Sequence, residues 1–101
     1  MNDNQLASEL LLETAQISWR ELQRFFASGH AIAVEESLDL IHVATQITND
    51  NAAQIKNWMN AGLVDAVNDS QAKIWYEQDA LVWALVVKPW VLVQQKNEQS
   101  L

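Results

Sequence analysis

From Leu38 to Leu63 the sequence reads LDLIHVATQITNDNAAQIKNWMNAGL, which predicts two short amphipathic helices joined by a polar turn. In the first helix, Leu40, Ala44 and Ile47 recur at the spacing that places side chains on one face of a helix. Ser37 stands just before these residues and is expected to cap the helix, because a serine side chain can accept hydrogen bonds from free backbone amides. The pattern predicts a helix with one buried face.

The second helix follows a polar turn made of Thr48, Asn49 and Asp50. Either Asn49 or Asp50 is expected to cap this helix. Its apolar residues are Ile55, Trp58 and Met59. Gly62 followed by Leu63 predicts the end of the helix, because glycine readily adopts the left-handed conformation and the next apolar residue packs back on the last turn.

Two helices with this turn are typical of a helix-turn-helix, but the second helix is poor in positive charge. Lys56 is its one base, and Gln54, Asn57 and Asn60 stand near it. A helix that lies along nucleic acid needs lysines and arginines, because these displace counterions from the phosphates. The segment has the helix pattern of a DNA-binding domain but lacks the positive charge that binding to DNA needs. We therefore do not expect nucleic acid to be the partner.

The residues before this segment predict more helix. Apolar side chains recur at helical spacing between residues 6 and 22. Ser18 followed by Glu21 is a capping-box pattern. Either a second helix therefore begins at Trp19, or one long helix continues to Phe26. Gly29 is expected to end this helix as its left-handed C-terminal residue.

Shorter elements are predicted on either side of the helix pair. Residues 31–35 predict a strand with Ile32 and Val34 on one face, and residues 63–67 predict a second strand. Asp69 is expected to cap a short helix that contains Ile74 and Trp75. These strands are too short to be stable alone, so they must pair elsewhere in the chain.

The longest strand-like segment runs from Leu81 to Val93, and its apolar residues fall on both faces. This pattern is typical of a strand that is covered on both sides, by its own chain or in part by a partner chain. Pro89 removes a backbone donor, so we expect the strand to bend or change neighbours between Lys88 and Trp90. A tight hairpin is not expected there, because two-residue hairpin turns favour residues with positive φ.

In order, the predicted elements are helix, strand, helix, turn, helix, strand, connection and strand, which is the order of a winged-helix domain. We therefore predict an α+β fold, a winged-helix-like single domain over residues 1–101 with an N-terminal helical extension. Residues 1–4 and 95–101 are expected to be flexible ends.

The composition indicates an acidic protein with an ordinary globular core. Of 101 residues, 13 are acidic and 6 are basic, and the net charge of −7 repels nucleic acid and anionic membranes and favours a basic partner. The chain contains no cysteine, which excludes disulfides and Cys-type zinc sites. No secretory signal is visible at the N-terminus, and the longest apolar run, from Ala80 to Val87, is too short to span a membrane. We expect a cytoplasmic protein without a membrane segment.

Four parts of the sequence are distinctive together. They are Ser18-Trp19-Arg20-Glu21-Leu22, Ser37-Leu38-Asp39-Leu40 with Val43-Ala44, Trp58 with Ala61-Gly62-Leu63, and Lys88-Pro89-Trp90-Val91-Leu92-Val93-Gln94. In these residues the chain resembles a small bacterial family of uncharacterised proteins, domain of unknown function 2288. The resemblance implies a compact cytoplasmic bacterial protein. It brings no assigned reaction, so it supplies no catalytic residues.

Asp39 and His42 are the candidates for metal ligands. They stand at i and i+3 of one predicted helix, where two side chains can point the same way, and carboxylate and imidazole both bind divalent cations. The simpler interpretation is that Asp39 favours the positive end of the helix and that His42 is a surface histidine. No phosphate loop or nucleophile motif is visible, so we predict no metal, no cofactor and no catalytic residues.

Five tryptophans are many for so short a chain. Trp58 lies on a helical apolar stripe and is expected in the core. Trp83 and Trp90 belong to the strand that Pro89 interrupts, and tryptophan is enriched at binding hot spots. We therefore predict Trp83, Trp90 and Pro89 as interaction residues.

The sequence favours a non-catalytic protein-interaction or regulatory module, with self-association between strands running from Leu81 to Val93 as the expected contact. A homodimer would follow from that contact, and a basic partner from the acidic surface. The alternatives are a DNA-binding winged-helix regulator, or a small enzyme or metal-binding protein whose site is assembled from distant residues.

Overall fold

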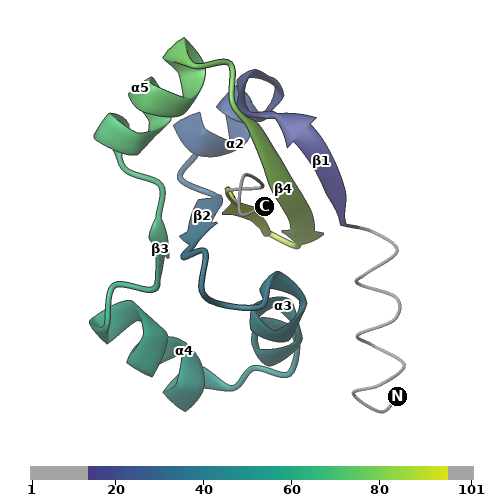
Figure 1. Ribbon diagram of the computed structural model, residues 1–101. Helices are drawn as coiled ribbons and strands as arrows, with labels where there is room; N and C mark the ends of the chain where they lie inside the picture. The colour runs from purple at the N-terminus through teal and green to yellow at the C-terminus, as the bar shows by residue number, and fades with distance from the viewer. Residues whose placement is uncertain (1–13, 96–101) are drawn as a thin grey trace, which may run out of the picture.

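A mixed five-stranded sheet organises residues 14–95, the part of the chain that the computed structural model describes (Figure 1). Its strands are β1 (Ala15–Ser18), β2 (Ala31–Val34), β3 (Val64–Ala66), β4 (Leu81–Val87) and β5 (Trp90–Gln94). They lie side by side in the order β1-β4-β5-β2-β3. All neighbours are antiparallel except β2 and β5, which are parallel. In the described residues, β1 and β3 are therefore the two edges of the sheet.

Helices cover both faces of this sheet (Figure 1). One face carries the 3-10 helix η1 (Trp19–Leu22), α2 (Gln23–Ala27) and α5 (Asp69–Glu77), and the other carries α3 (Leu40–Thr48) and α4 (Ala52–Asn60). Each face has its own hydrophobic core. In β5, Val91 and Val93 belong to the first core, Leu92 belongs to the second, and all three are buried. The expectation of a strand covered on both sides is confirmed, and the fold is α+β.

Polar residues cap the helices, but at positions next to the predicted ones. Asp39 caps α3, while the hydroxyl and amide of Ser37 both donate to Glu35. Asn51 caps α4, because Asp50 has a φ of 56° and forms the turn instead. A cap needs an extended backbone as well as a polar side chain, and the tertiary path of the chain decides which neighbour has it.

Asn68, and not the predicted Asp69, caps α5: its side chain accepts from the amide of Gln71 at 2.8 Å. Asp69 is the first residue of the helix, where its negative charge also favours the N-terminal end.

The predicted end of α4 is confirmed. Gly62 has a φ of 75°, and its amide donates to the carbonyl of Met59 at 3.1 Å. The amide of Leu63 donates to the carbonyl of Trp58 at 2.9 Å. This pair of hydrogen bonds is the Schellman motif, in which a left-handed residue lets two amides satisfy the last carbonyls of the helix.

The N-terminal region departs from its helical pattern. Residues 15–18 form β1 and pair with β4. The alternative of one long helix continuing to Phe26 is therefore wrong, and the alternative in which a helix begins at Trp19 is confirmed. Ser18 caps this helix by accepting from the amide of Arg20, whereas a capping box would use the amide of Glu21. Gly29 follows α2 with a φ of 79°, as predicted. Pairing with a neighbouring strand has overridden a helical periodicity. The helix expected over residues 6–13 and the flexible ends expected at 1–4 and 95–101 lie outside the described residues, apart from Gln95.

The prediction that no tight hairpin forms at Pro89 is wrong. β4 and β5 form an antiparallel hairpin in which Val87 pairs with Trp90, and the peptide bond between Lys88 and Pro89 is cis. A turn with a cis-proline at its third position needs no residue with positive φ. Residues 81–84 of β4 pair with β1 as well as with β5, and residues 91–93 of β5 pair with β2 as well as with β4. Most of this segment is therefore already paired within the chain, and the self-association expected through strand pairing from Leu81 to Val93 stays a prediction.

Candidate interaction surface

An apolar groove lies between α4, the end of α3 and the sheet. It has a volume of about 190 Å³. Its apolar lining residues are Ile32, Ile47, Ile55, Met59, Val64 and Trp90, and Asp65 and Ala66 of β3 complete its border. α4 supplies one wall because its Schellman end turns the chain directly into β3, and β2 and the first residue of β5 also contribute to the lining.

Trp90 and Met59 are the large exposed apolar side chains of the groove. Met59 is 51% exposed and Trp90 is 36% exposed. Trp90 is held in place by its pairing with Val87 and by an edge-to-face contact with the ring of His30, at 5.7 Å between ring centroids. The hydroxyl of Ser28 lies 3.1 Å from Nδ1 of His30. A fixed aromatic ring therefore stands at the open side of the groove.

The other predicted interaction residues lie differently. Pro89 is exposed at the tip of the hairpin, next to Trp90. Trp83 is half-buried and packs against the core between the sheet and α3 and α4, so it does not line the groove. Of the three predicted residues, Trp90 contributes directly to this surface. The prediction missed Met59 and Ile55 as its partners because their helical spacing is equally typical of core residues.

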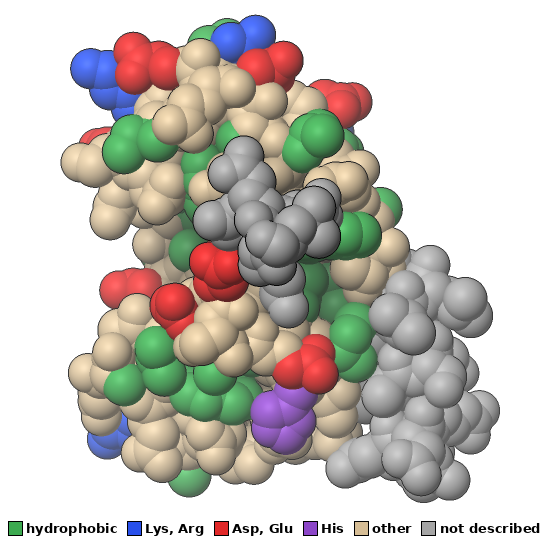
Figure 2. Space-filling model, viewed as in Figure 1, with side chains coloured by type: hydrophobic (Ala, Val, Ile, Leu, Met, Phe, Trp, Pro, Cys, Tyr) green, Lys and Arg blue, Asp and Glu red, His purple; other side chains and the backbone are tan. Residues whose placement is uncertain are grey.

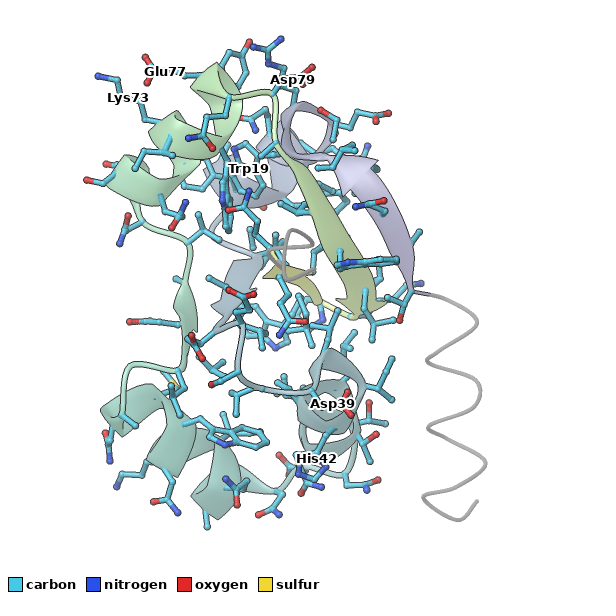
Figure 3. The ribbon with its side chains drawn as sticks, viewed as in Figure 1. Trp19, Asp39, His42, Lys73, Glu77 and Asp79 are labelled. Carbon is cyan, nitrogen blue, oxygen red and sulfur yellow. The ribbon has the colours of Figure 1, made fainter. Side chains whose placement is uncertain are left out.

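The candidate metal ligands Asp39 and His42 are engaged in the structure of α3. One carboxylate oxygen of Asp39 accepts from the amides of Ile41 and His42, at 2.9 and 3.4 Å. The ring of His42 contacts the ring of Trp58 edge-to-face, at 5.7 Å between centroids. Figure 3 shows both side chains at the end of the molecule opposite α5. Over the described residues, no group of three or more His, Cys, Asp and Glu side chains could hold a metal ion.

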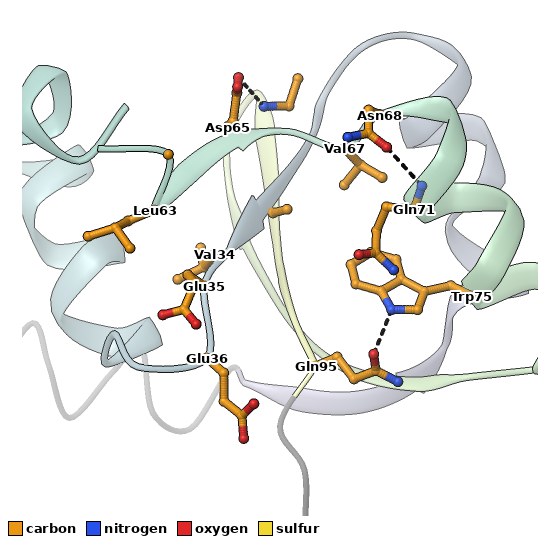
Figure 4. Close-up of a pocket in the computed structure, with 13 residues that line it drawn as sticks. Val34, Glu35, Glu36, Leu63, Asp65, Val67, Asn68, Gln71, Trp75 and Gln95 are labelled. Atoms are coloured by element: carbon orange, nitrogen blue, oxygen red, sulfur yellow. Dashed lines mark hydrogen bonds between the residues drawn. The ribbon is translucent and has the colours of Figure 1, made fainter. Parts of the chain in front are cut away.

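A polar hollow of about 420 Å³ lies across β3 from the groove, between β3 and α5 (Figure 4). Its lining includes the carboxylates of Glu35, Glu36 and Asp65, and no lysine or arginine of residues 14–95 lines it. The indole nitrogen of Trp75 closes one side by donating to the side chain of Gln95 at 2.7 Å. Figure 2 shows acidic side chains gathered near the middle of this face of the molecule. Sequence reasoning missed the hollow, because only the pairing of β2 with β3 brings its carboxylates together.

Glu35 is held in the hollow by hydrogen bonds from Ser37. Its carboxylate accepts hydrogen bonds from the hydroxyl and from the amide of Ser37, and these bonds hold the pKa of Glu35 below its usual value of 4.5. Glu35 is therefore ionised over the whole neutral and mildly acidic range, and the hollow keeps its negative character there.

The comparisons with known proteins agree with the sequence resemblance. Residues 5–95 match the family described as "Protein of unknown function (DUF2288)". The chain belongs to this family. PA1075 from Pseudomonas aeruginosa, whose solution structure was determined by NMR, is similar to this DUF2288 chain with 40% identity and a TM-score of 0.83. The similarity covers 96% of this chain and 90% of PA1075.

None of the curated proteins matches this DUF2288 chain. Within residues 14–95, the chain has no helix of the length and apolar character that crossing a bilayer requires. Family membership confirms the resemblance seen in the sequence, and it assigns no reaction to the groove or to the hollow.

Proposed function

We propose that this DUF2288 chain is a non-catalytic protein-interaction module of the cytoplasm that binds its partner through the groove beside β3. The observation that carries the proposal is the exposure of Trp90 and Met59 on an apolar groove. Small recognition sites have this character, with an apolar lining and a few polar groups at the border.

The free energy of binding would come from the two exposed side chains. Burial of apolar surface is worth about 25 cal/mol per Å², and tryptophan is among the residues most enriched at binding hot spots. Met59 adds an adaptable side chain that can fit against an irregular partner surface. A partner that covers both residues removes the largest exposed apolar side chains of the groove from water.

The surface is also ordered before a partner arrives. β5 is paired on both sides, and the amide of Val91, next to Trp90, donates to the carbonyl of His30 at 2.9 Å. The ring of His30 then contacts the ring of Trp90. A ring held in this way loses little conformational entropy on binding, which favours affinity.

The test is capture of the tagged chain from its own host, repeated with variants. Trp90→Ala is expected to lose a partner that the wild-type chain retains. The control Ile74→Ala, which changes an apolar residue on α5 that is 49% exposed, is expected to keep it. With the purified partner, Trp90→Ala should weaken binding about thirtyfold, from the ~2 kcal/mol typical of a hot spot. The proposal is contradicted if both variants retain the same proteins, with thermal melting showing that both are folded.

A DNA-binding winged-helix regulator is the second candidate, favoured by the geometry of α3, the three-residue turn and α4. The surface charge opposes it. Lys56 is the one base of α4, and Arg20 uses its guanidinium to donate to the carbonyl of Tyr76 at 2.8 and 3.0 Å. Tight binding to duplex DNA that weakens steeply with salt would establish this candidate in place of the interaction module.

A further inference from the structure

β3 is the edge strand on which the groove and the hollow meet, and within residues 14–95 no strand pairs with the side of its backbone that faces away from β2. In an antiparallel pair, positions that exchange hydrogen bonds alternate with positions whose backbone groups point away from the partner strand. The amide of Val67 donates to the carbonyl of Ala31 at 3.0 Å, which fixes this alternation. The backbone groups of Val64 and Ala66 therefore point away from β2, toward the side where the sheet ends.

The two faces of this edge differ in chemistry. Successive residues of a strand point to opposite faces. Val64 lines the apolar groove on the face of α4, whereas Glu35 and Glu36 line the hollow on the face of α5. Asp65 and Ala66 lie between the two and line both, and the alternation along β3 turns Asp65 toward the face of α5 and Ala66 toward the face of α4. A segment that extended the sheet beyond β3 would have every second side chain beside apolar residues and the others beside carboxylates.

Asp65 also protects the free edge of β3 from pairing. Its carboxylate accepts from the amide of Ala66 at 2.8 Å, so it occupies the outward-pointing donor of β3 (Figure 4). A short edge strand whose outward-pointing amide is already bonded to a carboxylate resists indiscriminate pairing with other strands. A positive charge near Asp65 would attract the carboxylate and release the amide of Ala66 to an incoming carbonyl.

We propose that an extended partner segment with alternating apolar and basic residues adds to β3 as a further strand, with its apolar side chains in the groove and its basic side chains beside Asp65 and Glu35. This inference rests on the proposed function and names the chemistry of the partner. Main-chain hydrogen bonds to Ala66 and Val64 supply part of the affinity. The apolar groove on one face of β3 and the carboxylates on the other supply the specificity. The net charge of −7 opposes a second copy of the chain as the occupant.

The probe is a blocked hexapeptide of alternating lysine and valine, titrated into the full chain labelled with nitrogen-15. Saturable shifts are expected at the amides of Val64 and Ala66, and hydrogen exchange of the Ala66 amide is expected to slow about tenfold or more. A peptide in which glutamate replaces lysine, and one with proline at the two middle positions, are expected not to bind, because the first has the wrong charge and the second lacks the backbone donors.

Two variants with the same change in net charge test the role of Asp65. Asp65→Asn is expected to weaken binding of the lysine peptide about twofold to fivefold, the range of an exposed ion pair. Asp50→Asn, at the turn between α3 and α4, is expected to leave the affinity unchanged, because Asp50 lines neither the groove nor the hollow.

The proposed strand pairing is overturned if the lysine peptide does not bind, if the glutamate peptide binds equally well, or if a dimer of the chain protects Ala66 without peptide. Shifts at Trp90 and Met59 with unchanged exchange of Ala66 would also overturn it, while leaving the groove as an interaction surface. The capture experiment with Trp90→Ala tests the proposed function separately, because it does not depend on β3.

Discussion

At the scale of single residues, Asp39 holds the start of α3 by accepting from two backbone amides. We predict that Asp39→Ala lowers the free energy of unfolding by about 1 kcal/mol, the usual effect of removing a helix cap. Asp39→Asn should keep most of this free energy, because an asparagine side chain caps equally well. Urea unfolding of the three proteins measures the effect. Equal losses in both variants would show that the charge of Asp39, and not its cap, stabilises α3.

Ser37 sets the acid response of the loop before α3. Because the folded pKa of Glu35 lies below its usual value of 4.5, its contact with Ser37 stabilises the fold above that value and is lost as the pH falls through the folded pKa. We predict that Ser37→Ala raises the pKa of Glu35, as followed by NMR titration of its carboxyl carbon. The stability difference from wild type should be present near neutral pH and vanish in acid. An unchanged Glu35 titration in the variant would refute this prediction.

Single residues also show where the sequence was ambiguous. The three polar residues Asn49, Asp50 and Asn51 stand before α4, and each has a side chain able to cap a helix. Asn51 is the cap because Asp50 adopts positive φ in the turn, and that depends on how α4 packs against the sheet. By contrast, the end of α4 at Gly62 could be predicted, because glycine is strongly preferred where the backbone must be left-handed.

At the scale of elements, Gln94 joins β5 to the loop before α3. Its side chain is 1% exposed and donates to the carbonyls of Glu35 and Leu38, at 3.0 and 2.7 Å. We predict that Gln94→Leu lowers the free energy of unfolding by about 1–3 kcal/mol, because both hydrogen bonds of the buried Gln94 side chain are lost and the carbonyl of Leu38 loses this donor.

The matched control for Gln94 is Gln16→Leu on β1, two strands away in the same register. Gln16 is exposed, so the same substitution there should change the free energy of unfolding by less than about 0.5 kcal/mol. Both values come from urea unfolding curves. If the two substitutions lower the free energy of unfolding equally, the hydrogen bonds from Gln94 to the loop before α3 do not stabilise the fold.

Strands were harder to predict than helices. The segment from Leu81 to Val93 was predicted as strand from its apolar residues, but the hairpin inside it depends on a cis-proline turn that the pattern does not reveal. Residues 15–18 have the spacing of a helix and nevertheless form β1. In both places the outcome depends on which distant strand is available for pairing, which a local pattern does not contain.

At the scale of the whole molecule, the candidate site is a product of sheet topology. β2 pairs in parallel with β5 and antiparallel with β3, and this arrangement places Trp90 on the same face as Met59. The sequence indicated Trp90 as an interaction residue from its type and its place beside Pro89. It could not indicate the groove, because its walls come from segments that are far apart in the chain.

The surface of the whole molecule leads to one measurement above the others. A photoreactive phenylalanine derivative replaces Met59 in the groove of the full chain in its own host, and replaces Ile74 on α5 in a matched strain. If the groove is the interaction surface, irradiation gives a discrete crosslinked product from position 59 and none from position 74. No product from position 59, or the same product from both positions, would contradict the account.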